Sequence, residues 1–364
     1  MKVLHIITRM NTGGPAVFLD HLTNAMSELS AQSTIAYGYC ESNEADYTKN
    51  HKLKADLIDI SSLHRSLNPL HDLKSFIKIR GIIKEVKPDL VNTHTSKAGV
   101  LGRLAAKSVN KELPVVHTFH GHLIYGYFAR YKTIIFTLIE RFLAHFTDAA
   151  VCITKETQDS LRGLGIGKNL KWQVIRLGIP TDQTLAFKTS SGRKTKLLWV
   201  GRFTDIKDPL YAVSVIKHLE KISPDCFELL MIGGGELLEA SKVASQNLPI
   251  NFTGWSDKPF QSAGSFDLLL LTSVNEGMGL VMLEAANQSR ATVARHVGGV
   301  SEFLRDGFNG LLVDGNADDM AQSISKLSNS EIIEMGISSR KILENEFSDK
   351  RLGEEYFNLY KSLA

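Results

Sequence analysis

One stretch, Glu276-Gly277-Met278-Gly279-Leu280-Val281-Met282-Leu283-Glu284, carries most of the information about fold and function in this sequence. The apolar run 267–273 before it is typical of a buried strand, so the order along the chain is strand, glycine loop and helix start. That order directs free backbone N–H groups and the positive end of a helix dipole toward a bound group, which favours a phosphate. We therefore expect residues 277–280 to contact the phosphate-bearing part of a ligand.

The two glutamates of this stretch are expected to differ in role. They are eight residues apart, which places them about 80° apart around a helix, so one helical face does not hold both. Glu276 is therefore expected in the loop and Glu284 in the second helical turn. A carboxylate accepts hydrogen bonds from neighbouring hydroxyls, such as those of a sugar or a ribose ring. This predicts a nucleotide-sugar site; the alternative is that both glutamates are surface residues of an ordinary helix.

The overall composition is that of a large globular protein. The 364 residues suggest about two domains, and 43% hydrophobic with 22% charged residues is ordinary globular chemistry. The sequence contains no run of 18 apolar residues, so we expect no membrane-spanning helix. Because the first apolar residues lead directly into a glycine loop, we do not expect them to be a signal peptide. Cys40, Cys152 and Cys226 have neither metal nor redox spacing, so we expect buried free thiols in a reducing cytoplasm.

The net charge of +3 conceals an asymmetry between the two halves. Residues 1–180 hold 23 Lys and Arg against 15 Asp and Glu, a net +8, and the remainder holds 19 against 24, a net −5. A basic half could meet nucleic acid, an anionic membrane surface or a phosphorylated acceptor. Because no helix-turn-helix, zinc-finger or RNA-binding signature is present, we do not expect nucleic acid as a partner.

Strand and helix patterns alternate along the chain, twice over. In the first half, strands are expected near 3–7, 33–38, 89–94, 114–118 and 149–154, with helices near 16–29, 72–86, 98–108 and 132–145. In the second half, strands are expected near 197–200, 228–232, 250–253, 267–273 and 292–294, with helices at 209–222, 317–327, 331–344 and 350–363. This alternation predicts an α/β protein with two Rossmann-like, doubly wound parallel sheets. We expect domains at 1–180 and 181–345, with a helix at 346–364 packing back on the first domain.

Loops after the strands are where an open α/β sheet binds its ligand. Gly13 and Gly14 follow the first strand and would let the backbone approach a ligand closely, unless they only shape a turn. Arg202 and Lys207 follow a strand of the second half and could both reach a diphosphate, one as a planar fork and the other as a point charge. Their alternative is a solvated pair of loop charges.

Three histidines, His117, His120 and His122, lie at the end of a strand in the first half. Such a cluster could suggest zinc, but no Cys, Asp or Glu nearby completes a tetrahedral set. The sequence also lacks an Asp-x-Asp triplet, so we expect no bound metal and no other cofactor. One histidine in the core and one at a ligand cleft are the expected roles.

In their order along nearly the whole chain, these motifs resemble those of the retaining glycosyltransferases of family four, which have the GT-B architecture. The matching segments are 13–15, 120–122, 201–202, 207–208, 276–284, 297–302 and 306–313. The segments 93–99 and 117–122 resemble the bacterial branch that builds O-antigen, lipopolysaccharide or capsule repeats. One departure is that no proline follows the Gly298-Gly299 turn, although Glu302 is kept.

The resemblance implies transfer of a sugar from a nucleotide-diphospho-sugar, with UDP as the expected nucleotide, to a glycan or polyprenyl-diphosphate-linked acceptor. Two domains would face each other across a cleft, with the donor on the C-terminal domain. It implies that Arg202 and Lys207 neutralise the diphosphate, that Glu284 binds the ribose and Glu276 the donor sugar, and that His120 contacts that sugar. The anomeric configuration would be retained, by same-face attack or through an ion pair.

Two further expectations concern the acceptor and the membrane. Lys97 and Arg130 are candidates for binding an acceptor phosphate, with a solvated surface position as the alternative. The protein is expected to be cytoplasmic and peripheral on the inner face of the cytoplasmic membrane. The basic residues expected to contact it, with the apolar residues between them turned to the core, are Lys74, Lys78, Arg80, Lys84 and Lys87. A sugar-nucleotide epimerase, a phosphorylase or a non-catalytic membrane-associated scaffold of the same fold are the alternative functions.

Overall fold

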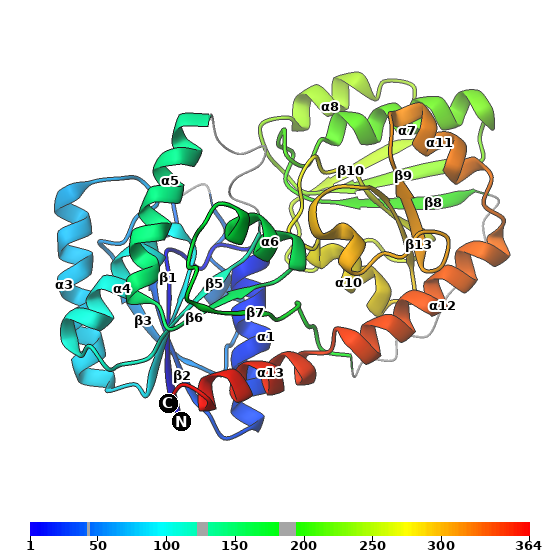
Figure 1. Ribbon diagram of the computed structural model, residues 1–364. Helices are drawn as coiled ribbons and strands as arrows, with labels where there is room; N and C mark the ends of the chain where they lie inside the picture. The colour runs from blue at the N-terminus through cyan, green and yellow to red at the C-terminus, as the bar shows by residue number, and fades with distance from the viewer. Residues whose placement is uncertain (42–43, 122–129, 182–193) are drawn as a thin grey trace. The chain divides into compact units, whose positions relative to one another are not determined.

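A computed structural model describes residues 1–41, 44–121, 130–181 and 194–364, and it divides into two compact units. Unit 1 comprises Met1–Pro180 with Ser348–Ala364, and unit 2 comprises Thr181–Phe347. Each unit is built around its own parallel sheet (Figure 1). The predicted fold class, an α/β protein with two doubly wound parallel sheets, is confirmed.

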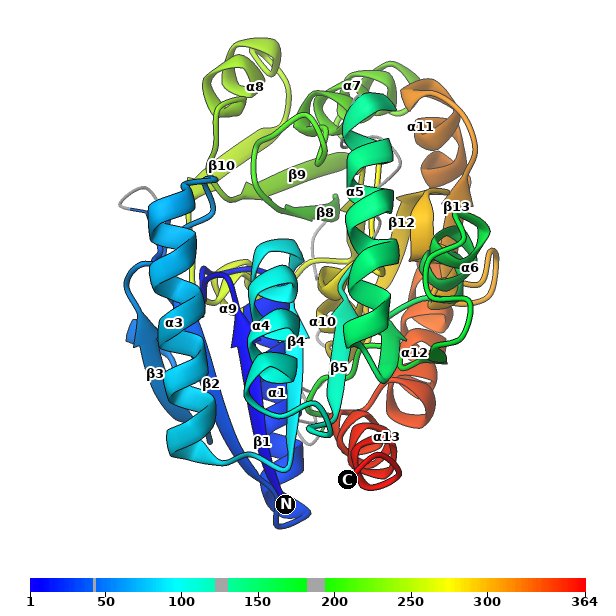
Figure 2. The same cartoon turned by 60° about the vertical axis from the view of Figure 1, so that its left-hand side comes forward.

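Unit 1 contains a seven-stranded sheet in the order β3-β2-β1-β4-β5-β6-β7, with every pair parallel. Its elements are β1 (Lys2–Ile7), α1 (Gly14–Glu28), β2 (Gln32–Gly38), α2 (Tyr47–Asn50), β3 (Asp56–Ile60), α3 (Pro69–Val86), β4 (Leu90–His94), α4 (Ser96–Val109), β5 (Val115–Phe119), α5 (Arg130–Leu143), η1 (Ala144–Phe146), β6 (Ala149–Cys152), α6 (Lys155–Gly163), β7 (Lys171–Val174) and α13 (Asp349–Lys361). Helices α3, α4 and α5 cover one face of the sheet and α1 and α13 the other (Figures 1 and 2). The strand order reverses between β1 and β4, which is where such sheets bind ligands.

Unit 2 contains a six-stranded parallel sheet in the order β10-β9-β8-β11-β12-β13. Its elements are β8 (Thr195–Val200), α7 (Pro209–Ile222), β9 (Phe227–Ile232), α8 (Leu238–Ala244), β10 (Ile250–Gly254), α9 (Pro259–Ser262), β11 (Leu268–Leu271), α10 (Leu280–Asn287), β12 (Ala291–Arg295), η2 (Gly298–Glu302), β13 (Gly310–Val313), α11 (Ala317–Ser325) and α12 (Asn329–Glu346). The reversal lies between β8 and β11. The carboxyl ends of these two strands are the expected place for a ligand.

The C-terminal helix α13 is held on unit 1 by aromatic and polar contacts. The Asn92 amide donates to the Tyr360 hydroxyl at 2.6 Å, and the Tyr356 hydroxyl lies 3.2 Å from the Thr118 hydroxyl. A Cβ on Gly353 would lie 2.6 Å from the Cβ of Ala25 in α1, so the absence of a side chain lets the two helices touch. These buried polar groups are paired, which removes the cost of burying them.

Most of the edge strands in the described sheets were not predicted from the sequence. The patterns above predict the edge strand β10 but not β3, β7 or β13, which are also outermost in their sheets. An edge strand contacts a neighbour on one side only and needs no continuous apolar run, so its signal is weak. Helices α6 and α8 are short and were also not predicted.

Two other expectations are wrong in detail. Cys226 is exposed and Cys40 is only partly buried, so Cys152 alone of the three is a core thiol. On α3, Ile77 lies between two of the predicted membrane-contact cations and is exposed rather than turned to the core, whereas Ile79, Ile82 and Ile83 are buried. The helix has its apolar residues on more than one face, and the sheet can cover only one of them. Across the described parts of the chain, no helix is long and apolar enough to cross a membrane.

Candidate active site

In unit 2, the loops after β8 and β11 are bound to each other at the strand reversal. The Val274 N–H donates to the Ile206 carbonyl at 2.9 Å. The Thr272 hydroxyl lies 2.9 Å from the Lys207 carbonyl and accepts from the Trp199 indole at 2.9 Å. These contacts join the predicted cation loop to the predicted glutamate loop. Both loops therefore present their side chains at one edge of the sheet.

Glu276 lies in the loop before α10, as predicted, and its side chain is held on two sides. Its carboxylate forms an ion pair with Lys207 and accepts a hydrogen bond from the Ser273 hydroxyl at 2.6 Å. The residue is 8% exposed. A carboxylate that is this buried needs such partners, because an unpaired charge out of water is costly. The sequence did not reveal that Lys207 and Glu276 are partners.

The backbone of Glu276 is also fixed, by the Gly298-Gly299 turn. The Gly299 N–H donates to the Glu276 carbonyl at 3.1 Å. Gly298 has a φ of 52°, and a Cβ there would lie 2.0 Å from the same carbonyl oxygen. Only glycine allows this approach. The turn without its usual proline thus still supports the glutamate loop.

The glycine loop ends at Gly279, the residue that caps α10 with a φ of 78°. Gly277 is partly exposed and Met278 is buried, and Leu280 is the first residue of the helix. The Met282 N–H donates to the Gly279 carbonyl at 2.9 Å, so the N–H groups of Leu280 and Val281 are the ones at the helix start that can point to a ligand. Helix α10 therefore offers the expected donors for an anion.

Glu284 lies in the second turn of α10, as predicted. It is partly buried, and burial raises the pKa of its carboxyl to about 7. Among the described residues it makes no hydrogen bond and no ion pair. A carboxylate without a protein partner is available to a ligand that brings hydroxyl groups.

Arg202 is exposed, and no described residue pairs with it. The next residue, Phe203, is fully buried and its N–H donates to the Gly234 carbonyl at 2.9 Å. The loop is thus anchored by Phe203 while the adjacent guanidinium extends into solvent. Arg202 and Lys207 share this loop, but only Lys207 is paired with Glu276.

A second ion pair next to this loop was not predicted. Arg295, at the end of β12, lies 3.1 Å from the Asp208 carboxylate and donates to the Thr272 carbonyl at 3.3 Å. Its guanidinium also lies over the Tyr211 ring at 4.7 Å. Asp208 is the N-cap of α7, and its side chain accepts from the Tyr211 N–H. These residues fix the base of the Lys207 loop, and no spacing in the sequence connects them.

In unit 1, Gly13 and Gly14 stand at the start of α1, close to the strand reversal. Gly13 has extended backbone and caps the helix. A Cβ on Gly14 would meet nothing within 4 Å, and one on Gly13 would meet only the Asn11 carbonyl at 3.8 Å. Among the described residues, no side chain fills the space next to either glycine. This is expected where a ligand approaches the backbone closely.

His120 follows β5 and is partly exposed. Its Nε2 lies 3.0 Å from Nδ1 of His94, and the Phe18 ring packs edge-on against it with centroids 4.8 Å apart. Burial lowers the pKa of His120 to about 3, so its imidazole is neutral at physiological pH. The predicted cleft histidine therefore sits at the end of β5 with its ring orientation fixed.

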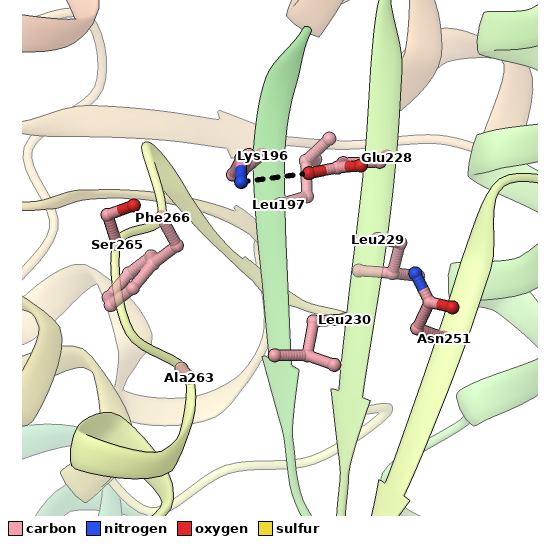
Figure 3. A pocket seen from close by; sticks show the side chains of 9 residues that line it. All are labelled: Lys196, Leu197, Glu228, Leu229, Leu230, Asn251, Ala263, Ser265 and Phe266. Carbon is pink, nitrogen blue, oxygen red and sulfur yellow. Dashed lines mark ion pairs between the residues drawn. The ribbon is translucent and has the colours of Figure 1, made fainter. Parts of the chain in front are cut away.

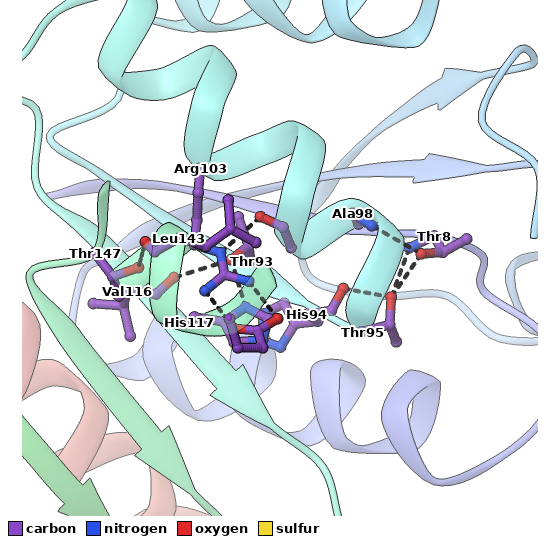
Figure 4. Close-up of polar contacts among 12 residues, drawn as sticks. Thr8, Thr93, His94, Thr95, Ala98, Arg103, Val116, His117, Leu143 and Thr147 are labelled. Atoms are coloured by element: carbon purple, nitrogen blue, oxygen red, sulfur yellow. Dashed lines mark hydrogen bonds and ion pairs between the residues drawn. The ribbon is translucent and has the colours of Figure 1, made fainter. Parts of the chain in front are cut away.

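His117 lies on the opposite face of the same strand and has a structural role. It contacts the Thr93 hydroxyl at 2.8 Å, and a Cβ on Gly99 would lie 2.6 Å from its ring (Figure 4). Beside it, Arg103 donates twice to Glu140, at 2.8 and 2.9 Å, with both side chains almost fully buried. His117 is thus a core histidine, and His122 lies outside the described residues.

Thr95, between β4 and α4, is a further feature that the sequence does not signal. Its φ of 64° is unusual for a β-branched residue. The Thr95 hydroxyl lies 2.7 Å from the Thr8 hydroxyl, which accepts from the Ala98 N–H at 3.1 Å (Figure 4). Strained residues of this kind persist where neighbours fix them, and they cluster at functional sites.

Lys97 and Arg130 are the two residues predicted to bind the acceptor phosphate. Lys97 lies in the first turn of α4, forms an ion pair with Asp72 and donates to the Ser66 carbonyl. To bind a phosphate, the Lys97 ammonium would have to break its contacts with Asp72 and Ser66 or keep them while also contacting the phosphate. Arg130 is the first residue of α5, and its side chain lies outside the described residues.

The described residues contain no group of three or more His, Cys, Asp or Glu placed to hold a metal ion. A small cavity, of about 130 Å³, lies elsewhere in unit 2, near the beginnings of β8 and β9 (Figure 3). It is lined by Lys196, Glu228 and Phe266 among others. Because it opens at the amino ends of the strands, it is at the edge opposite to the Glu276 loop.

Two parallel-sheet units, each with polar loops at its strand reversal, are the arrangement that the GT-B architecture predicts. Residues 12–183 match the family described as Glycosyltransferase Family 4, and residues 194–330 match Glycosyl transferases group 1. These matches together cover most of the chain, which therefore belongs to this glycosyltransferase family.

Individual proteins agree with this assignment. An Escherichia coli UDP-Gal:alpha-D-GlcNAc-diphosphoundecaprenol alpha-1,3-galactosyltransferase is 26% identical over 321 residues, 83% of this chain and 82% of the relative. The O-antigen biosynthesis glycosyltransferase WbnH of Escherichia coli is 26% identical over 88% of both chains. The structure of Anabaena Alr3699/HepE in complex with UDP aligns over 100% of both chains with a TM-score of 0.79 at 18% identity. The last likeness supports the fold.

Proposed function

We propose that this protein transfers a sugar, with retention of configuration, from a UDP-sugar to a polyprenyl-diphosphate-linked glycan in surface polysaccharide synthesis. The observation that carries the proposal is the pairing of Glu276 with Lys207 at the strand reversal of unit 2, next to the start of α10 and Glu284. The acceptor class is supported by the relatives, since the Escherichia coli enzyme is named for a diphosphoundecaprenol acceptor. A Campylobacter jejuni relative, 23% identical over 88% of this chain and 86% of its own, is named for a PP-undecaprenol acceptor.

Different residues of unit 2 would bind different parts of the donor, each according to the chemistry of its side chain. Lys207 and Arg202 offset the negative charge that develops on the diphosphate as the sugar leaves. Glu276 accepts hydrogen bonds from sugar hydroxyls, and Glu284 accepts them from the ribose. Because Lys207 already pairs with Glu276, one ammonium would link the sugar-binding group to the leaving group.

Unit 1 would supply the acceptor side and the remaining contacts. Gly13 and Gly14 let the backbone come close to the substrates, and His120 hydrogen-bonds the transferred sugar. Lys97 and Arg130 are proposed to bind the acceptor diphosphate. Lys97 is already in an ion pair with Asp72, so this role requires exchange of a protein carboxylate for a phosphate.

The direct test is a panel of nucleotide-sugars incubated with the protein and a synthetic polyprenyl-diphosphate GlcNAc acceptor. We expect release of UDP from one UDP-sugar, dependent on the acceptor, and a product with the anomeric configuration of the donor by NMR. An inverted product would refute retention. Epimerised donor without transfer would favour the epimerase alternative, and no reaction with any donor would favour the non-catalytic scaffold.

Activity is expected to survive chelation. Two cations of the protein, Arg202 and Lys207, can offset the leaving-group charge without a divalent ion. Transfer rates should therefore agree within about twofold with and without EDTA. Loss of activity in EDTA that is restored by Mg²⁺ or Mn²⁺ would overturn metal independence.

The affinity for UDP is expected to depend on pH through Glu284. Its pKa of about 7 means that the carboxyl is largely protonated below pH 7, while hydroxyl donors favour the ionised form. Binding should therefore release a proton below pH 7, and the affinity should fall by up to about tenfold per pH unit on lowering the pH from 7 toward 5. The phosphate of UDP also titrates in this range, so the measurement is the difference between the wild type and Glu284→Gln by calorimetry. Identical pH profiles of the two proteins would contradict the ribose assignment.

We also propose that the protein is peripheral on an anionic membrane, which would bring it to a lipid-linked acceptor. The basic first half, with its net +8, is suited to such a surface. Lys74, Lys78, Lys84 and Lys87 are exposed on or just after α3, and Arg80 is partly buried with its guanidinium 5.8 Å from the Phe76 ring. Electrostatic attraction is the first component of the proposed binding.

Helix α5 adds an apolar component, because it exposes a stripe of large apolar side chains although Leu143 on its other side is buried. Beside the exposed Arg141, the described part of the helix exposes five large apolar side chains: Ile134 61%, Ile135 53%, Leu138 57%, Ile139 41% and Phe142 57%. At about 100° per residue they span roughly 140° of the helix. Its buried side chains include Glu140 and Thr137. The buried glutamate is satisfied by Arg103, which leaves the opposite apolar stripe facing outward.

Vesicle co-sedimentation over a salt series separates the two components. We expect binding to anionic vesicles that weakens with salt, because screening shortens the reach of the charges to about 10 Å at 0.1 M. Replacing the five α3 cations by Ser should remove the salt-dependent part, and Ile135→Ser with Leu138→Ser should weaken the remainder. Val243→Ser on α8, an exposed apolar residue of unit 2, is the matched control.

Equal binding to neutral and anionic vesicles, or none to either, would reject the electrostatic account. Self-association that Ile135→Ser with Leu138→Ser abolishes would assign the α5 stripe to a second copy instead.

A further inference from the structure

Three histidines form a continuous row on the face of the unit 1 sheet that α1 covers. His5 lies in β1, His94 ends β4, and His120 follows β5. His5 Nδ1 lies 3.2 Å from His94 Nε2, and His94 Nδ1 lies 3.0 Å from His120 Nε2. His5 and His94 are fully buried and His120 is partly exposed. The row therefore runs from the core of the unit to its surface.

All three rings are neutral at physiological pH. Burial lowers the pKa of His5 and of His120 to about 3, and burial together with the neighbouring rings lowers the pKa of His94 well below its usual value. A neutral imidazole carries one N–H and one bare nitrogen. Both hydrogen bonds of the row then form only if the three rings carry the proton on the same nitrogen, all on Nδ1 or all on Nε2.

The buried end of the row distinguishes these two states. His5 Nε2 is sealed from solvent and has no hydrogen-bond partner among the described residues. With all protons on Nε2, an N–H group would be buried there without an acceptor, which folded proteins rarely tolerate. With all protons on Nδ1, that position is a lone pair, and the N–H at the other end belongs to His120. No described residue accepts from His120 Nδ1.

We propose that His5 and His94 are positioning residues that fix His120 as the Nδ1–H tautomer, so that it offers a hydrogen-bond donor to an oxygen of the transferred sugar. This inference rests on the proposed function, in which His120 contacts that sugar. A neutral donor stabilises a developing partial charge without bringing a full charge into the site. The Phe18 edge contact holds the plane of the ring in which this N–H lies.

The tautomer is read directly by ¹⁵N NMR of the histidine side chains in the labelled full-length protein at neutral pH. The expected result is three neutral rings protonated on Nδ1, assigned by single His→Gln replacements. Protonation of His120 on Nε2 would overturn the proposal. This readout requires no catalysis, so a failure of the proposed transfer reaction and a failure of the histidine row are distinguished.

Variants of His5 test the effect on the reaction. His5→Leu keeps a side chain of similar size but no donor, and His5→Asn places an amide N–H close to the position of Nδ1. We expect His5→Leu to give a mixed His120 tautomer and a kcat about tenfold lower, with the KM for the donor changed less than about twofold. His5→Asn should restore both the tautomer and most of the kcat. If His5→Leu does not fold, His94→Leu is the second variant with the same expectation. A lower melting temperature with unchanged tautomer and kcat would show a purely structural role and overturn the proposal.

Discussion

Replacing Glu276 by alanine or glutamine is expected to lower kcat at least a hundredfold, while the affinity for UDP changes by less than about threefold. A hundredfold loss corresponds to about 2.7 kcal/mol of transition-state stabilisation. The reason is that the carboxylate is already fixed by Lys207 and Ser273, so it binds sugar hydroxyls without further ordering. Steady-state kinetics with the active donor and calorimetry with UDP measure the two quantities separately.

The control for this experiment is Glu228→Gln. Glu228 belongs to the same unit and pairs with Lys196 at 3.3 Å, but it lies at the opposite edge of the sheet (Figure 3). Its replacement should leave kcat within about twofold of the wild type. Wild-type turnover in a folded Glu276→Ala protein would refute the proposal that Glu276 binds the donor sugar. A large loss of UDP affinity in that variant would instead move Glu276 to the nucleotide.

The glutamate loop illustrates what a sequence can predict about a site. The apolar run, the glycines and the acid spacing all lie within 267–284, so the strand, the loop and the helix start follow from local patterns alone. Glu276 in the loop and Glu284 in the second turn are both confirmed as positions. Their roles remain predictions. These elements are visible because their patterns are local, whereas the groups that hold Glu276 (Lys207 and the Gly299 N–H) are distant in sequence.

Contacts between distant strands could not be predicted in the same way. His5 and His94 are 89 residues apart, and they meet because β1 pairs with β4, with Ile7 opposite His94. Arg295, the last residue of β12, meets Asp208, in the loop after β8, although the two are 87 residues apart in sequence. Knowledge of a parallel sheet does not give the strand order, and without the order these side chains have no predicted neighbour.

Helix α5 shows a different limit of sequence analysis. Apolar residues at helical spacing predict an amphipathic helix, and the usual interpretation turns the apolar stripe to the core. Here Glu140 is buried together with Thr137 and Leu143, and Arg103 from α4 offers the glutamate a bidentate partner inside the unit. The spacing of the apolar residues therefore does not determine which side of α5 faces the unit.

Arg202→Ala and Lys207→Ala are each expected to weaken UDP binding by about tenfold and to slow transfer. A charged hydrogen bond to phosphate contributes about 1.5–3 kcal/mol, and an exposed partner such as Arg202 lies at the low end. The two effects should not add, because both cations serve one diphosphate. The measurement is a double-mutant cycle of UDP affinity by calorimetry. We expect a coupling free energy of at least about 0.5 kcal/mol.

The structure adds an asymmetry to this cycle. Removing Lys207 also leaves Glu276 without its cation at 8% exposure, so Lys207→Ala should lower the thermal stability of unit 2, whereas Arg202→Ala should not. Combining Lys207→Ala with Glu276→Gln removes the unpaired charge and should restore most of that stability without restoring UDP affinity. UDP binding with unchanged affinity in both single variants would refute the diphosphate assignment. Strict additivity with full loss in each would instead place the two cations on separate parts of the donor.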